Sequence, residues 1–289
     1  MGGSYSQEDI ETVALGMYRN HLQNDYPQVL PDVGIDESLL KYSGPDSNAA
    51  LQAFSNEMLN SVPGYISGLG SAFGPLTSVP NAVGLGALVI SMIIEIAIKS
   101  STQKSDDDTY SLLRRVFGEE KASSVRDTMS EYLKRHRMSM NNDQLLREDI
   151  KRLEHQLSHH LTILRNSLLQ DGQMSSRGFK IWVNGAAFHV QMLIHGARLG
   201  VQANETASDY VHQIKAAINM YLQYLVPLLK EHKTYKIKDG GQIWTAFMDV
   251  VYSNYEPITG LKSYFLNIKY NLNSRIHERG SFTLPSAAG

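Results

Sequence analysis

Apolar residues recur along this chain mainly with the period of an α-helix. The clearest repeat has spacings of four and three residues and consists of Leu146, Ile150, Leu153, Leu157, Leu161, Leu164 and Leu168. Such a stripe is typical of a helix that packs like a coiled coil. Asn142 or Asp143 is a suitable N-cap, and Gly172 is a suitable stop. The pattern therefore predicts one long helix over residues 143–170.

Further helical patterns lie on both sides of this long helix. They cover residues 6–23, 47–60, 109–138, 205–232, 240–257 and 259–279. Residues 181–197 are apolar nearly all round, which predicts the central helix of the fold. Pro227 is expected to kink the helix in which it lies. No strong alternation of apolar and polar residues indicates a strand, so the predicted class is all-α.

Residues 61–99 depart from the amphipathic pattern. Residues 61–80 are rich in Gly and Pro and carry no charge, and residues 82–98 carry a single charge, Glu95. Together they predict an apolar helical hairpin, interrupted at Pro75 and Pro80. We therefore expect a helical bundle with one long coiled-coil-like helix and this hairpin packed on or in it. Residues 1–289 should form one domain, with flexible termini at residues 1–6 and 281–289.

Three interpretations of the hairpin stay open: a static core helix, a buried segment that can be released, and a permanent transmembrane anchor. Residues 82–98 lie at the short end of the ~17–25 residues that a spanning helix needs. Glu95 would cost ~2.5–3.5 kcal/mol at the centre of a bilayer and much less near its surface. A permanent anchor is thus the least favoured of the three. Residues expected to insert on release are Tyr65, Ile66, Leu69, Phe73, Val83, Leu85, Leu88, Val89, Ile90, Met92, Ile93, Ile94, Ile96 and Ile98.

Composition narrows the function classes. Charged residues make up 19% of the 289 residues and the formal net charge is −2, so there is no general attraction to nucleic acid. The chain has no cysteine, which excludes disulfides, thiolate metal sites and a cysteine nucleophile. No signal peptide is visible at the N-terminus. A cytoplasmic or membrane-associated location is favoured, and secretion by a non-standard route stays open.

The N-terminal residues match the motif M-G-x-x-x-[ST], with Gly2 as the acceptor of a myristoyl group and Ser6 at the serine position. A flexible start without modification is the alternative. One myristoyl chain binds membranes only marginally, so an anchor at Gly2 would need a second signal.

Few residues suggest chemistry. His155 and His159 lie four apart on the long helix and could clamp a metal, but no suitable third ligand is evident, so a solvated face is preferred. His189 and His195 lie on the apolar helix and are interpreted as hydrogen-bonded core residues or pH-sensitive groups. Lys134, Arg135 and Arg137 could meet lipid headgroups, although a solvated helix face is favoured. No nucleotide-binding or hydrolase motif is present, so we expect no enzyme, no cofactor and no metal.

The predicted layout resembles the α-helical pore-forming toxins of the haemolysin E and Bacillus tripartite enterotoxin type. The matching parts are the apolar hairpin of residues 65–98 and the long helix of residues 143–170. The resemblance concerns architecture only, because no motif is shared and the apolar segment here precedes the longest helix. It implies a non-enzymatic protein that binds membrane lipid, inserts the 82–98 segment and remodels or perforates the bilayer. Assembly into homo-oligomers stays open, and no protein partner is indicated.

Two other functions compete with membrane insertion. One is an intracellular interaction or scaffold protein that is anchored through Gly2. The other is a carrier of an apolar small ligand, held between residues 181–197 and the C-terminal aromatic residues Trp244, Phe247, Tyr252 and Tyr264.

Overall fold

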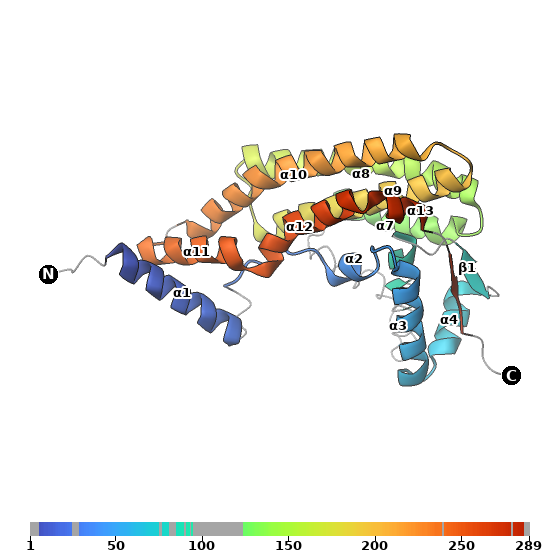
Figure 1. Ribbon diagram of the computed structural model, residues 1–289, viewed down its shortest axis with the longest axis horizontal. Helices are drawn as coiled ribbons and strands as arrows, with labels where there is room; N and C mark the ends of the chain where they lie inside the picture. Colours follow the sequence, from blue (N-terminus) through green and yellow to red (C-terminus); the bar gives the residue numbers. More distant parts are fainter. Residues whose placement is uncertain are drawn as a thin grey trace.

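The order of the secondary-structure elements is shown in Figure 1, which colours the chain from its N-terminus to its C-terminus. The computed structural model describes residues 6–24, 29–74, 77–80, 85–89, 91–92, 94, 124–238, 240–278 and 280–285. These residues are almost entirely helical, so the predicted all-α helical bundle is confirmed.

The first part of the chain forms α1 (Gln7–Gln23), α2 (Glu37–Lys41), α3 (Ser47–Ser61), α4 (Tyr65–Phe73) and the strand β1 (Ser78–Pro80). The second part forms α7 (Ser124–Ser139), α8 (Asp143–Gln170), α9 (Ser176–Gln202), α10 (Ala207–Ile237), α11 (Gln242–Asn254), α12 (Glu256–Tyr270), α13 (Leu272–His277) and the strand β2 (Ser281–Thr283). The long helix predicted over residues 143–170 is confirmed as α8. Helix α10 continues through Pro227 and ends five residues beyond the predicted limit at His232.

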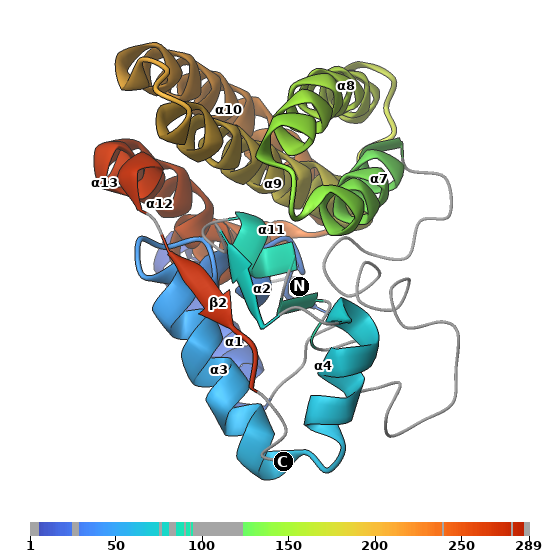
Figure 2. The ribbon, with the colours of Figure 1, turned by 90° about the vertical axis from the view of Figure 1, so that its right-hand side faces the viewer.

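The core is built around α9. Its side chains from Ile181 to His195 are all buried, which confirms that residues 181–197 form the central helix. Figure 2 shows α9 between α7, α8, α10 and the α12–α13 pair, and α7, α8, α10 and α13 all pack directly against it. An α-helix that is apolar on every side is stable in water only when other elements cover it in this way.

Helix α8 packs on α9 through the predicted leucine stripe. Six of the seven stripe residues are buried, and Leu164 is half-buried. At its N-terminus, the side-chain oxygen of Asn142 accepts a hydrogen bond from the backbone N–H of Leu145 at 3.0 Å. Gly185 on α9 allows the close approach, because a Cβ there would lie 2.8 Å from atoms of Leu161 on α8 and Val125 on α7.

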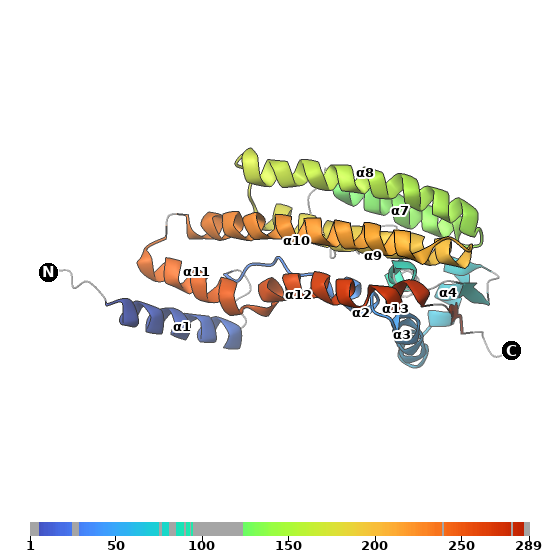
Figure 3. The same ribbon diagram turned by 45° about the horizontal axis from the view of Figure 1, so that its top comes forward.

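Different secondary-structure elements lie at the two ends of the bundle. Figure 3 shows α1 and α11 side by side at one end and α3 and α4 at the other. Helix α1 begins with a capping box between Ser6 and Asp9, and it buries only Ile10 and Ala14. The end that carries α3 and α4 also holds the two strands, so α4 and β1 of the apolar segment lie there.

Strands β1 and β2 pair antiparallel although they are far apart in sequence. In the stretch expected to be a flexible C-terminus, residues 281–283 form β2 and the side chain of Phe282 is fully buried. The exposed fraction of Val79, its partner on β1, is also 0%. This pair joins the C-terminus to the apolar segment.

Candidate functional site

The apolar segment of residues 61–99 is folded into the protein where the structure describes it. Residues 65–73 form α4, and residues 85–89, 91, 92 and 94 are helical again. Of the residues expected to insert, the following are buried: Tyr65, Leu69, Phe73, Leu85, Leu88, Val89, Met92 and Ile94. Ile66 is half-buried, and Val83, Ile90, Ile93, Ile96 and Ile98 lie outside the described residues.

The two helical pieces are separated by a turn and an extended stretch. Gly74 ends α4 with φ of 66°, a left-handed conformation that favours glycine. The chain then runs through β1, and the next described residues, 85–89, are helical. The interruption expected near Pro80 is therefore present, and Pro75 lies outside the described residues. The extended stretch gives the segment a backbone to which another strand can pair.

That strand belongs to the C-terminal clasp, which we define as Glu278 together with residues 280–284. Val79 of β1 lies opposite Phe282 of β2, and the backbone N–H of Leu284 donates to the carbonyl oxygen of Thr77 at 3.1 Å. The side chain of Gln52 on α3 binds Thr283 of the clasp, accepting from its N–H at 3.1 Å and donating to its carbonyl oxygen at 3.2 Å. The clasp thus connects the apolar segment with α3.

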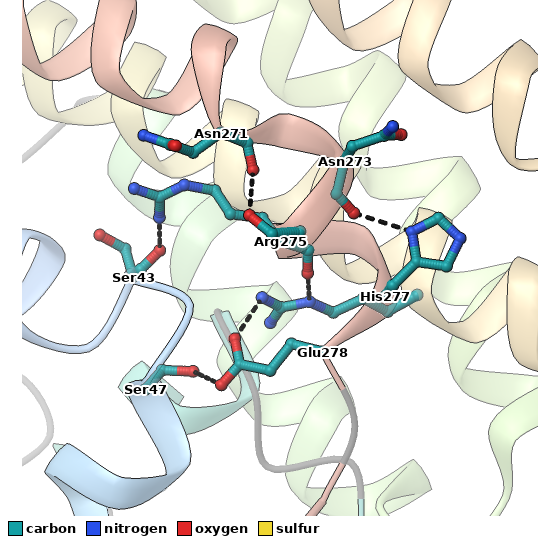
Figure 4. A network of polar contacts seen from close by, with 9 residues as sticks. Ser43, Ser47, Asn271, Asn273, Arg275, His277 and Glu278 are labelled. Carbon is teal, nitrogen blue, oxygen red and sulfur yellow. Dashed lines mark hydrogen bonds and ion pairs between the residues drawn. The ribbon is translucent and has the colours of Figure 1, made fainter.

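A buried polar cluster fixes the base of the clasp. Arg198 of α9 donates from Nη2 to Oε2 of Glu278 at 3.0 Å and from Nε to the carbonyl oxygen of Arg275. Figure 4 shows Ser47 and Glu278 facing each other, and the Ser47 hydroxyl donates to Oε1 of Glu278 at 3.4 Å. Arg275 itself binds the carbonyl oxygen of Ser43. The cluster ties the central helix, the C-terminus and the start of α3 together.

Burial shifts the pKa values of Arg198 and Glu278 toward their neutral forms, and the attraction between the two charges opposes these shifts. Burial lowers the pKa of Arg198 to about 10, and the neighbouring Glu278 partly offsets that shift. Burial raises the pKa of Glu278, which the charge of Arg198 opposes. At neutral pH Arg198 is still charged. Removing one partner would leave a buried charge without its counter-ion, which is strongly destabilising.

The predicted polar residues of α9 do not form one site. His195 meets α7, where Nδ1 contacts the hydroxyl of Tyr132 at 2.7 Å and the ring of His136 lies 5.3 Å from its own. His189 instead meets α8 and α10, through Glu154 and Tyr221. Each histidine therefore belongs to a different helix contact.

The histidines of α8 do not form a metal site among the described residues. His155 and His159 are exposed, and His160 contacts the hydroxyl of Thr128 at 2.8 Å. In the part of the chain that the structure describes, no group of three or more candidate side chains could hold a metal ion.

The predicted lipid-headgroup residues divide into two kinds. Lys134 and Arg135 both pair with Glu131, at 3.5 and 2.7 Å. Arg137 instead donates to the carbonyl oxygen of Ala72 in α4 at 3.3 Å, so one basic side chain borders the apolar segment. Gly2 lies outside the described residues.

The aromatic residues proposed to line a ligand cavity are spread over several contacts. Tyr264 accepts a hydrogen bond from Gln191 of α9 at 3.0 Å. Phe247 packs near His21 of α1, with the ring centroids 5.2 Å apart, and Tyr252 contacts His232 of α10 at 2.6 Å. The Nε1–H of Trp244 donates to the carbonyl oxygen of Lys236. Of these four aromatic residues, Tyr264 is therefore the one with a hydrogen bond to the central helix.

Comparisons with protein families, with curated proteins and with solved structures find no match to this chain. Within the described ranges, no helix is both long and apolar enough to cross a membrane.

One feature of the sequence points to the polar cluster. Arg198 is the only charged residue between Ile181 and Gly200. An arginine at the end of such a helix is rarely buried without a partner. That partner, Glu278, lies eighty residues further along the chain, and no local pattern identifies it.

Proposed function

We propose that this protein is a non-enzymatic α-helical protein that interacts with membranes and inserts the apolar segment of residues 61–99 after releasing it from the bundle. One observation carries the proposal: the segment that carries almost no charge is held by the C-terminal clasp. Strands β1 and β2 have three residues each, so few backbone hydrogen bonds need to break for the segment to separate from the C-terminus.

The free energy of burial favours a membrane as the acceptor. Eight of the described residues expected to insert are buried, and exposing eight such side chains to water would cost on the order of 15 kcal/mol. Typical folded proteins have a total stability of ~5–15 kcal/mol. Release into water is therefore unfavourable, whereas a bilayer core would replace the apolar surroundings that the segment loses.

A positive charge beside the apolar segment also supports binding to a membrane. Arg137 lies at the C-terminal end of α7 and binds a carbonyl oxygen of α4. A cation in this place would bring α4 toward anionic lipid, and exposed basic residues near a membrane surface contribute ~1 kcal/mol each.

The test is dye release and co-sedimentation with vesicles of phosphatidylcholine, with and without phosphatidylserine, at pH 7.5 and pH 5. The wild-type protein is compared with a variant that lacks residues 281–289, whose fold is checked by circular dichroism. We expect the truncated protein to release dye faster at pH 7.5 than the wild type. Absence of both leakage and lipid binding for both proteins at both pH values would overturn the proposal.

A further inference from the structure

A groove of about 640 Å³ opens between the first half of α8 and the start of α10. Its apolar floor includes Ile150 of α8 and Leu193 and Gly196 of α9. Gly196 carries no side chain, and this deepens the groove over α9. The volume lies within the ~300–1,000 Å³ that is usual for small-molecule sites.

A buried carboxylate lines this groove. The exposed fraction of Glu154 is 9%, and its Oε2 lies 3.2 Å from Nε2 of His189. Its Oε1 lies 2.6 Å from Nδ1 of His155. Nδ1 of His189 in turn contacts the hydroxyl of Tyr221 at 3.0 Å. Burial raises the pKa of Tyr221, so its phenol keeps its proton.

Glu154 has no lysine or arginine as an ion-pair partner among the described residues. Its ion-pair contacts are with His155 and His189. An ionised carboxylate offers about four lone-pair positions, so two imidazole contacts leave acceptor sites open toward the groove. A charge buried to this degree is normally paired with a cation.

The other charges along the groove do not supply that cation. Arg147 is paired with Glu205, which also accepts a hydrogen bond from the hydroxyl of Tyr210. Lys151 is exposed, and its backbone carbonyl oxygen contacts Nδ1 of His155 at 2.8 Å. No ion pair joins the ammonium group of Lys151 to Glu154.

We propose that this groove binds a small amphipathic primary amine. The ammonium group donates to the carboxylate of Glu154, and the apolar chain lies along Ile150, Leu193 and Gly196. This site is independent of the proposed membrane function, because it is formed by α8, α9 and α10 and includes no residue of the apolar segment or the clasp.

The experiment is isothermal titration of the full-length protein with hexylammonium chloride, with 1-hexanol and sodium hexanoate as probes of the same length. We expect hexylammonium to bind more tightly than either. Glu154→Gln keeps the shape of the side chain but removes the charge and replaces one acceptor oxygen with an NH2 donor, and it should weaken binding roughly tenfold or more. Glu148→Gln removes a carboxylate from the exposed rim of the groove and is the matched control; it should weaken binding far less than Glu154→Gln.

Two more variants separate binding from folding. Gln213→Trp places a large side chain at an exposed position on the wall of the groove, and it should block binding without touching Glu154. Lys151→Met removes a like charge from the rim and should strengthen the binding of hexylammonium. Equal binding of hexylammonium and hexanol, no binding to the wild type, or unchanged binding to both Glu154→Gln and Gln213→Trp would overturn the proposal.

Discussion

Acidification should destabilise this protein, because several buried histidines exclude the proton in the folded state. His136 on α7 and His195 on α9 face each other, and Tyr132 contacts the second ring. Burial lowers the pKa of His136 from 6.5 to about 4. Burial also lowers the pKa of His195 well below its ordinary value, and the charges of His136 and Arg198 add to that shift. The pKa of His232 is lowered to about 4, mainly by burial.

The size of the effect follows from the difference between folded and unfolded pKa values. Below pH 6.5 the unfolded chain binds a proton at each of these histidines, whereas folded His136 and His232 do not until the pH approaches 4. Burial also keeps the proton off folded His195 in the upper part of this range. Stability therefore falls as the pH falls through this range, and the decline ends below it. For one histidine with these values the loss is about 2 kcal/mol at pH 5 and about 3 kcal/mol below pH 4.

The assay is urea unfolding followed by circular dichroism at pH 8 and pH 5. His136→Leu removes one titrating group from the core. Between the two pH values this variant should lose about 2 kcal/mol less stability than the wild type. Met129→Ala is the control: it opens a cavity on the same helix without removing a titrating group, and its loss between pH 8 and pH 5 should equal that of the wild type.

Parallel pH profiles for His136→Leu and the wild type would refute this reasoning, because they would show that His136 does not exclude the proton. A wild-type stability that is unchanged between pH 8 and pH 5 would refute it for all three histidines. If His136→Leu loses less stability on acidification than the wild type, protonation of His136 is one way in which acid weakens the contact between α7 and α9.

Three further predictions concern the clasp and the long helix, and each is measured by urea unfolding at pH 7.5. Phe282→Ala removes a fully buried ring and should lower the free energy of unfolding by ~3–5 kcal/mol. Arg198→Met leaves Glu278 without its counter-ion and should lower the free energy of unfolding by ~3–5 kcal/mol. Adding Glu278→Gln should recover part of that loss, and strict additivity of the two changes would show that the side chains do not interact. Asn142→Ala removes the cap of α8 and should cost ~1 kcal/mol, whereas no change would show that the cap is not needed.

The periodic parts of this fold could be predicted from the sequence. The leucine stripe of α8 and the apolar run of α9 extend over many turns, so each contains enough repeats to identify a helix and its buried face. The capping side chain of Asn142 and the stop at Gly172 fixed the limits of α8. Burial of α9 then followed, because an apolar helix needs cover on every side.

The clasp could not be predicted, because its strands are too short to show a period. Val79 and Phe282 meet across two hundred residues, and their three-residue strands lie in segments that resemble loops. The same limit applies to the polar cluster, since Glu278 lies eighty residues from Arg198 in the sequence and meets it only through tertiary packing. For His136 and His195 the decisive information is the packing of α7 on α9, which sequence patterns did not specify.

The most direct test of the central claim is a disulfide that locks β1 to β2. Ser78 and Thr283 are exposed cross-strand partners, and opposite residues in antiparallel pairs have Cα atoms ~4.5–5.5 Å apart, within the reach of a disulfide. The chain has no cysteine, so Ser78→Cys with Thr283→Cys forms one defined bond, and either single variant is the control. If release of the apolar segment is required, the oxidised double variant releases no dye from phosphatidylserine-containing vesicles, and reduction restores leakage to the level of the single variants. Equal leakage from the oxidised and reduced forms, or no leakage from either, would contradict the account.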